Sequence, residues 1–280
     1  MTCIWEYFNK IQPLNEIKFA IYILELGMPK LQALLFDVDG TLADTERDGH
    51  RIAFNMAFSD AGLNWDWTVE IYEDLLSVTG GKERMKYFLD KYKPEFEEPE
   101  DLDSYIAYMH KAKTAHYTEL LAKGAIPLRP GVERILNEAR ECGYRLAIST
   151  TTTPANVEAL LTHTLGKESM DWFEVIAAGD IVPAKKPAPD IYDWALEKMN
   201  LKADDCIAFE DSRNGILSSL AANLKTIITI NDYTKDHDFS GAAIVLDQYG
   251  EPGAGFKVIE GDAHGFEYVN MNMIEALHSA

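Results

Sequence analysis

The sequence contains little cysteine. Its 280 residues include three, Cys3, Cys142 and Cys206, and they form neither a CxxC pair nor a metal-ligand spacing. An odd and sparse count is typical of a protein from a reducing compartment, and it argues against a catalytic or zinc-binding thiol. We therefore expect these cysteines to be buried or incidental.

Long apolar runs are also missing. No uninterrupted run approaches the ~20 residues that cross a bilayer, and the most apolar N-terminal stretch, 19–28, is short and carries Glu25. Neither a secretory signal nor an Arg-rich transit peptide is predicted. We expect the compact fold to begin near Met28 and treat residues 1–30 as an extension; residues 1–27 are either a helical appendage or an upstream-start artefact. The predicted location is the cytoplasm, or the plastid stroma of a photosynthetic eukaryote.

Basic residues are scarce relative to acidic ones. The chain has 26 Lys and Arg against 46 Asp and Glu, which gives a net charge of −20. Such a field repels a phosphate backbone, so we predict no nucleic-acid partner, and we expect a monomer with no membrane partner. It also repels anionic metabolites. Any phosphate site in this chain must therefore gather its own cations.

Short apolar runs alternate with helical patterns over most of the chain. The runs lie at 31–36, 144–149, 174–178, 206–209, 226–230 and 242–246, and a helical period over Val132, Ile135, Leu136 and Ala139 is one of those between them. This alternation predicts an α/β fold, with a Rossmann-like, mainly parallel sheet as its core and helices on both faces.

One stretch breaks the alternation. Residues 47–123 are rich in helix formers, with apolar spacings such as Ile52, Ala53, Met56 and Ala57, and show no convincing strand. They predict an all-helical cap inserted after the first strand, with an exposed acidic loop inside it and a return linker over 124–131. The core then comprises 31–46 and 124–250, and a tail covers 251–280.

The segment FDVDGTLADTE points most directly to chemistry. Asp37 ends the first buried strand, and Asp39 follows on a turn that contains Gly40. Two carboxylates this close repel one another unless a cation lies between them or one is protonated. Phosphoryl transfer can use the pair, because one carboxylate attacks phosphorus while the other protonates the leaving oxygen and later activates water. The alternative is an ordinary pair of loop aspartates.

Two further segments place phosphate-binding groups at strand ends. In RLAISTTTT a strand ends at Thr150, whose hydroxyl, with the amides beside it and Thr151, could hold a phosphoryl oxygen. In VPAKKPAPDIY, Lys185 and Lys186 precede a helix, and a lysine there could neutralise the nucleophile. Alone, the threonines could be helix caps and the lysines solvated loop residues.

The segment CIAFEDSRNG ends a strand with adjacent acids, Glu210 and Asp211. Mg²⁺ prefers hard oxygen ligands, so Asp211 could supply one and Asp37 another. In a parallel sheet all strand carboxyl ends lie along one edge, where ligands of open α/β folds bind. The fold therefore brings these segments together.

This ordered set resembles the haloacid dehalogenase superfamily over residues 31–246. The resemblance implies Asp37 as the nucleophile and Asp39 as the acid and base, which also offers its main-chain carbonyl to Mg²⁺. It further implies that Thr150 and Lys186 hold the phosphoryl group, and that Asp211 completes the metal site with Glu210 nearby. Lys186 is chosen over Lys185 because it precedes Pro187.

The inserted region is similar to the cap of the subgroup that contains β-phosphoglucomutase and phosphoglycolate phosphatase. The segments ADTERDGHRIAFN and TGGKERM resemble the CbbY-like phosphatases of Calvin-cycle operons, a branch linked to the rubisco inhibitor xylulose-1,5-bisphosphate. We expect Lys82 and Arg84, in a loop with Gly81, to grip a second phosphate. Glu46 and His50 could contact sugar hydroxyls or shuttle a proton, although His50 could equally be a capping or core residue.

Two other functions stay open. A sugar phosphomutase of the β-phosphoglucomutase type shares every core residue and returns the phosphoryl group to sugar instead of water. A binding or regulatory protein could keep the fold without the chemistry. Intact Asp37, Asp39, Lys186 and Asp211 argue against the second.

Overall fold

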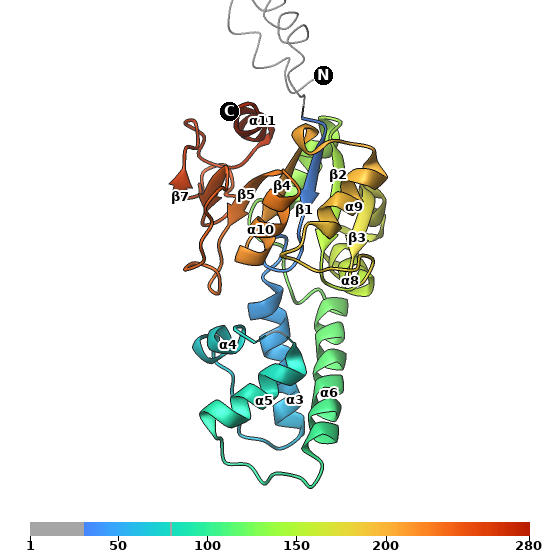
Figure 1. The fold of residues 1–280 in the computed structure, drawn as a ribbon, viewed down its shortest axis with the longest axis vertical. Helices are drawn as coiled ribbons and strands as arrows, with labels where there is room; N and C mark the ends of the chain where they lie inside the picture. The colour runs from blue at the N-terminus through green and yellow to red at the C-terminus, as the bar shows by residue number, and fades with distance from the viewer. Residues whose placement is uncertain (1–30, 79) are drawn as a thin grey trace, which may run out of the picture.

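The computed structural model describes residues 31–78 and 80–280, and its centre is one sheet (Figure 1). The strand order is β3-β2-β1-β4-β5-β6-β7, and every neighbouring pair is parallel except β6 and β7, which are antiparallel. The predicted α/β fold with a mainly parallel sheet is therefore confirmed. The predicted N-terminal extension, 1–30, lies outside the described residues.

The six strands that the sequence patterns predict follow one another in the expected order, and β7 comes after them. The strands are β1 (Ala33–Phe36), β2 (Arg145–Thr150), β3 (Phe173–Ala178), β4 (Cys206–Glu210), β5 (Lys225–Thr229), β6 (Ile244–Leu246) and β7 (Val258–Gly261). The α-helices are α3 (Arg51–Asp60), α4 (Val69–Leu75), α5 (Gly81–Tyr92), α6 (Leu102–Ala122), α7 (Val132–Glu141), α8 (Pro154–Leu165), α9 (Asp190–Met199), α10 (Arg213–Ala221) and α11 (Met271–Ser279). Shorter turns are the π-helix η1 (Glu46–His50) and the 3₁₀ helices η2 (Lys167–Trp172) and η3 (Ala203–Asp205).

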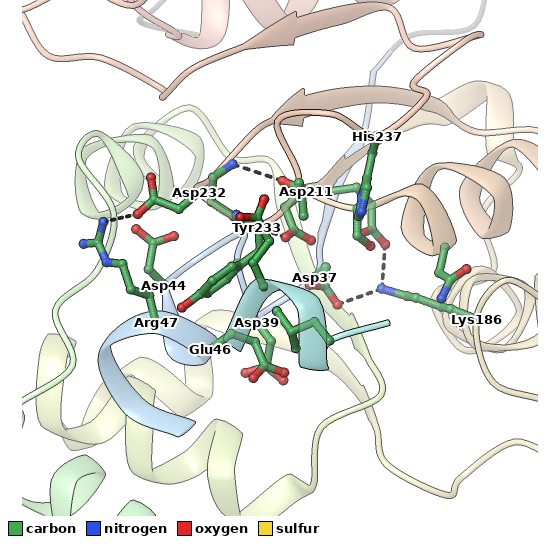
Figure 2. Close-up of a pocket in the computed structure, with 18 of the residues that line it drawn as sticks. Asp37, Asp39, Asp44, Glu46, Arg47, Lys186, Asp211, Asp232, Tyr233 and His237 are labelled. Atoms are coloured by element: carbon green, nitrogen blue, oxygen red, sulfur yellow. Dashed lines mark hydrogen bonds and ion pairs between the residues drawn. The ribbon is translucent and has the colours of Figure 1, made fainter. Parts of the chain in front are cut away.

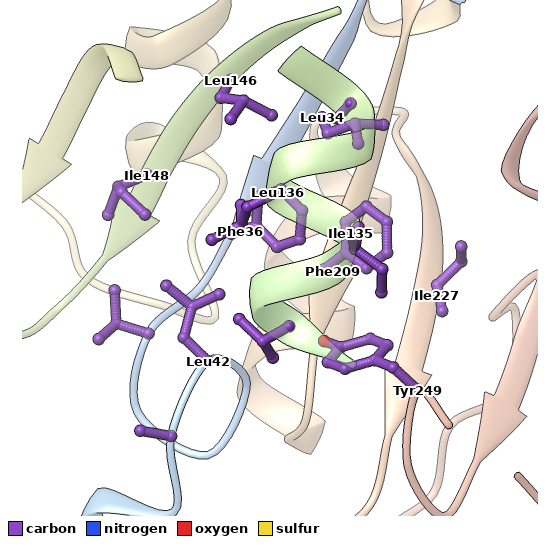
Figure 3. Close-up of a cluster of buried hydrophobic side chains, with 14 of the residues drawn as sticks. Leu34, Phe36, Leu42, Ile135, Leu136, Leu146, Ile148, Phe209, Ile227 and Tyr249 are labelled. Atoms are coloured by element: carbon purple, nitrogen blue, oxygen red, sulfur yellow. The ribbon is translucent and has the colours of Figure 1, made fainter. Parts of the chain in front are cut away.

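The central strands are buried on both faces, as their continuous apolar sequences predict. Side chains alternate between the faces: Leu34 and Phe36 pack with Ile135 and Leu136 of α7 (Figure 3), whereas Leu35 belongs to a second cluster under α9. Helices on both faces therefore fix the sheet from either side. Such packing holds the strand ends in place.

The residues between β1 and α7 form helices that extend from one end of the sheet (Figure 1). They contain no strand among those described, which confirms the inserted helical cap. Its core is aromatic, with Phe54 and Trp67 rings 4.5 Å apart. Of the apolar set that the sequence pattern indicates in α3, Ala53 and Ala57 are buried and Ile52 and Met56 are only partly so. Phe54 and Phe58 complete the buried face.

Two linkers join the cap to the sheet, and they pair with each other. Ala43 bridges Leu128 in antiparallel fashion, and the amide of Arg129 donates to the carbonyl of Leu42 at 2.8 Å. The first linker leaves β1 directly after Asp37. The cap therefore lies over the carboxyl ends of the parallel strands.

The tail packs against the core. Helix α11 places Met273 and Ile274 in the main buried cluster, and β7 adds an exposed antiparallel edge strand that the sequence did not indicate. Among the described residues, none of the helices combines the length and apolar character of a membrane span.

Candidate active site

A pocket of about 690 Å³ lies where the cap faces the sheet (Figure 2). Its lining comes from the ends of β1, β2, β4 and β5 on one side and from the cap on the other. The sequence-predicted residues in this lining are Asp37, Asp39, Glu46, Arg84, Thr151, Lys186, Glu210 and Asp211. The fold therefore brings segments that are far apart in the sequence to one cavity.

Asp37 lies on the floor of this pocket with Lys186. The Lys186 ammonium donates to Asp37 Oδ1 at 2.7 Å (Figure 2). It also donates to Glu210 Oε1 at 2.5 Å and to the carbonyl of Ser149 at 2.8 Å. Burial works against the charge of Lys186, but the Asp37 and Glu210 carboxylates outweigh it and raise the pKa of the ammonium. Lys186 is thus a fixed cation beside the predicted nucleophile, whereas Lys185 pairs with Asp180 at the pocket rim.

The adjacent acids at the end of β4 have different partners. Glu210 accepts from Lys186 and from the Tyr192 hydroxyl, at 2.6 Å. Asp211 Oδ2 accepts from the Asn231 amide at 2.7 Å. Gly40 approaches the same oxygen so closely that a Cβ there would lie 2.1 Å from it, which only glycine permits. Asp211 is thus enclosed by two loops.

These residues fit a divalent cation. Asp37, Glu210 and Asp211 each offer a carboxylate oxygen, and the three oxygens lie within 4.8 Å of one another. Burial, with the neighbouring carboxylates, raises the pKa of Glu210 to about 7 and that of Asp211 well above its usual value. Crowded, buried carboxylates of this kind are relieved by a hard cation such as Mg²⁺. The side chain of Asp39 lies outside this group.

Asp39 instead turns toward the first linker. The Thr45 hydroxyl donates to Asp39 Oδ1 at 2.6 Å. Burial, with the charges of Asp37 and Glu46, raises the pKa of Asp39 to about 7, although the hydrogen bond from Thr45 opposes the rise. A carboxyl group poised near neutral pH can both give and take a proton.

The two predicted threonines occupy different environments. Thr150 is buried at the end of β2, where its hydroxyl accepts from the Thr152 amide at 3.3 Å. Thr151 lines the pocket and is exposed. Thr153 caps α8, with its side chain accepting from the Asn156 amide.

The cap contributes Glu46 and Arg84 to the pocket. The Tyr72 hydroxyl donates to Glu46 Oε2 at 2.6 Å, and Arg84 lies 3.5 Å from the same oxygen. Burial disfavours the charge of Glu46, but the neighbouring cations and Tyr72 outweigh it and hold its pKa below the usual value. Arg84 itself donates to the Val78 carbonyl and to the Tyr72 hydroxyl, each at 3.0 Å, so these groups orient its guanidinium beside Glu46.

His50 lies behind this pair and does not line the pocket. Its ring stacks on Tyr117 at 3.9 Å, and its Nδ1 lies 2.7 Å from the Lys113 ammonium. Burial, reinforced by the charge of Lys113, lowers the pKa of His50 to about 3. A proton shuttle needs a pKa near the working pH, so the structure favours the core-residue alternative.

The remaining predicted cap residues are also outside the lining. Gly81 begins α5 beside the ring of His110, and a Cβ at that position would lie 2.7 Å from the ring. Lys82 follows it and is exposed. Arg84 is thus the member of the predicted phosphate-gripping pair that the structure places in the pocket.

Comparison with known proteins agrees with this geometry. Residues 31–223 match the family of haloacid dehalogenase-like hydrolases. The chain belongs to this family. Protein CbbY of Rhodobacter capsulatus is 50% identical over 213 residues, which cover 76% of this chain and 91% of that protein. The CBBY-like protein of Arabidopsis thaliana is 40% identical, with 79% of this chain and 70% of that protein covered.

A solved structure is similar as well. A CbbY mutant from Rhodobacter sphaeroides in complex with xylulose-1,5-bisphosphate has a TM-score of 0.66 and 44% identity, covering 78% of this chain and 94% of that one. The family and these relatives identify the chain as a phosphatase. The resemblance to the haloacid dehalogenase superfamily and its CbbY-like branch is therefore confirmed.

Within this family site, sequence reasoning missed three kinds of contact. Thr45 orients Asp39, and Asn231 orients Asp211. A loop after β5 closes the pocket toward the cap, where Asp232 pairs with Arg47 at 2.9 Å and the Tyr233 ring lies 5.7 Å from Tyr72. Asn231 was findable, because it directly follows a predicted strand. Thr45 and the loop carried no comparable signal.

Proposed function

We propose that this chain is a Mg²⁺-dependent phosphatase that hydrolyses a sugar bisphosphate through an aspartyl-phosphate on Asp37. Xylulose-1,5-bisphosphate is the first candidate substrate. The observation that carries the proposal is the division of roles between two carboxylates: Asp37 lies against Lys186 and the acid cluster, while Asp39 lies apart with a pKa of about 7. The likeness to a CbbY complex with this bisphosphate supports the substrate.

The reaction has two steps. An oxygen of Asp37 attacks phosphorus, the bond from phosphorus to the sugar oxygen breaks, and Asp39 gives its proton to that oxygen. Asp39, now ionised, takes a proton from water, which attacks the aspartyl-phosphate; phosphate leaves and the carboxylate of Asp37 is restored. Lys186 offsets negative charge beside Asp37 throughout.

Charge explains why the metal is needed. Among the described residues of the pocket lining, nine carboxylates face four lysine and arginine side chains. This excess of acidic groups opposes the binding of a phosphorylated sugar, and further positive charge would offset it. Bound by Asp37, Asp211, Glu210 and the main-chain carbonyl of Asp39, Mg²⁺ would supply that charge and polarise the phosphoryl oxygens.

The experiment is Mg²⁺-dependent phosphate release from xylulose-1,5-bisphosphate, beside ribulose-1,5-bisphosphate, phosphoglycolate and β-glucose-1-phosphate. We expect strong preference for the first and a loss of about 10⁴-fold or more in Asp37→Asn, because the nucleophile is removed. Activity confined to monophosphates would refute the bisphosphate. Conversion of β-glucose-1-phosphate to another sugar phosphate would favour a mutase. Absence of turnover with all four compounds would favour a binding protein.

Arg84 and Lys82 form a matched pair for the second phosphate. Because Arg84 lines the pocket and Lys82 does not, Arg84→Ala should raise KM for a bisphosphate by about 10-fold or more and change KM for a monophosphate much less. Lys82→Ala should leave the KM values for both substrates within about twofold of the wild-type values. Steady-state kinetics on both substrates measure this. Equal effects of the two variants would contradict the assignment.

A further inference from the structure

A buried arginine occupies the return linker from the cap. Arg129 lies between α6 and α7, and its side chain is 5% exposed. A guanidinium this deeply buried is costly unless its donors are satisfied. The groups that satisfy its donors therefore indicate the role of this side chain.

The Arg129 guanidinium forms an ion pair with Asp44, whose Oδ1 lies 3.6 Å from Nε, and it binds main-chain carbonyls from three separate segments. Nη1 donates to the carbonyls of Gly40 and Thr229, the latter at 3.0 Å, and to the Thr229 hydroxyl at 3.2 Å. Nη2 donates to the carbonyls of Ile230 at 2.5 Å and Asp247 at 3.2 Å. One side chain thus joins the loop after β1 to the ends of β5 and β6.

Two of these segments enclose Asp211. Gly40 abuts Asp211 Oδ2 from the loop after β1. Asn231, which follows Ile230, donates to the same oxygen from the loop after β5. The spacing between the two loops therefore determines where this carboxylate can lie. Arg129 holds both loops through their carbonyls.

We propose that Arg129 is a positioning residue that sets the Asp211 carboxylate for metal binding. It acts through Gly40 on one side and the Ile230–Asn231 peptide on the other. The proposal rests on the proposed function in taking Asp211 as a metal ligand. Arginine suits this task because its planar fork carries five donors, whereas lysine offers a single nitrogen.

A purely structural role is the competing explanation, and Arg134 provides the matched control. Arg134 is a partly buried arginine of α7 that also donates to main-chain carbonyls, those of Gly250 and Val269, both at 2.7 Å. It does not line the pocket. Loss of either guanidinium removes hydrogen bonds to carbonyls, but only Arg129 holds the loops around Asp211.

The test compares Arg129→Lys and Arg129→Gln with Arg134→Lys in the full chain. Calorimetric titration with Mg²⁺ alone measures metal affinity, and an aryl phosphate gives kcat and KM without reference to any sugar. Both Arg129 variants should bind Mg²⁺ about 10-fold more weakly and lose kcat to a similar degree, since residues that orient metal ligands have effects of this size. KM should change little. Arg134→Lys should lower Tm only.

Other results would contradict either the role of Arg129 or the proposed function. If Arg129→Lys keeps wild-type Mg²⁺ affinity and kcat while its Tm falls as in Arg134→Lys, the residue is structural and the proposal fails. It also fails if neither Arg129 variant folds. If wild-type protein neither binds Mg²⁺ nor turns over any phosphate ester, the proposed function itself is overturned. If the wild-type protein binds Mg²⁺ and Arg129→Lys binds it equally well, the role of Arg129 is overturned and the proposed function stands.

Discussion

Asp37 and Asp39 stand two residues apart on one loop, yet different neighbours hold their carboxylates. Lys186 fixes Asp37, whereas the Thr45 hydroxyl fixes Asp39. The Lys186 ammonium offsets negative charge beside the oxygen that would attack phosphorus. Burial favours a protonated carboxyl, which can serve the leaving group. The pair is thus asymmetric because of its surroundings.

Removal of the Thr45 hydroxyl should shift a pH profile. That hydrogen bond lowers the pKa of Asp39 against the effect of burial, so Thr45→Val should raise it above about 7. The protonated form needed for the first step then survives to higher pH. We expect the alkaline limb of kcat/KM on a sugar phosphate to move up by about one pH unit, because such hydrogen bonds contribute about 1.5 kcal/mol.

Two controls isolate this effect. Thr41 is a buried threonine of the same loop whose hydroxyl has no hydrogen-bond partner among the described residues, so Thr41→Val should leave the limb in place. An aryl phosphate, whose leaving group needs no proton, should show no such limb in any variant. A limb that stays at the wild-type pH in Thr45→Val would contradict the role of Asp39.

Residues at strand ends were the predictable part of the site. Asp37 and Asp211 each follow an apolar run and line the pocket, because the carboxyl ends of parallel strands meet at one edge. At the end of β2 the pocket is lined by Thr151, while Thr150 is buried outside the lining. The cap residues were less predictable, because a helix shows which residues share a face but not which face meets the pocket. His50 and Lys82 show this limit, since both lie outside the lining.

Among the elements, α6 contains an unusual feature. Lys113 is buried on this helix, between the rings of Phe54 and Tyr117, with its ammonium 2.7 Å from His50 Nδ1. Burial lowers the pKa of Lys113 to about 8, although Glu46 partly opposes the shift. The folded state therefore binds this proton less tightly than the unfolded chain does.

Replacement of Lys113 by methionine should stabilise the protein in a pH-dependent way. A folded pKa of about 8 against a usual 10.5 costs stability fully below pH 8, and the cost disappears as pH rises toward 10.5. Lys113→Met should therefore gain up to about 3 kcal/mol at pH 7 and progressively less toward pH 10. Urea unfolding at several pH values measures this.

Lys111 on the same helix supplies the control. It is exposed, so Lys111→Met should change the free energy of unfolding by less than about 0.5 kcal/mol at every pH. If Lys113→Met destabilises the protein at pH 7, the hydrogen bond to His50 outweighs the cost of burial, and the expectation is wrong.

Whole elements were more predictable than their orientation. All six strands expected from apolar runs are present within two residues of the expected bounds. Strand β7 was missed because its residues are exposed and show no buried pattern. In α3 the apolar spacing named two residues that are buried, Ala53 and Ala57. The spacing did not show that Phe54 and Phe58 join them, because packing against Trp67 decides this.

At the scale of the whole molecule, the net charge of −20 opposes the approach of an anionic substrate. Added salt screens this repulsion. We expect kcat/KM for a sugar bisphosphate to rise about two- to fivefold from low ionic strength to 0.15 M at constant free Mg²⁺. An uncharged solute such as sucrose should not raise kcat/KM. A rate that falls with salt would show that the cations at the pocket dominate the field.

The paired linkers have a consequence beyond catalysis. Bridged residues of antiparallel strands have Cα atoms about 5 Å apart, so the chain leaves the sheet at Ala43 and returns at Leu128 through almost the same point. An insertion whose ends meet leaves the spacing of the host strands unchanged, and its closure cost grows only slowly with its length. In evolutionary terms the cap is a module: it can be replaced by another, and substrate choice can diverge while the sheet and its chemistry stay constant.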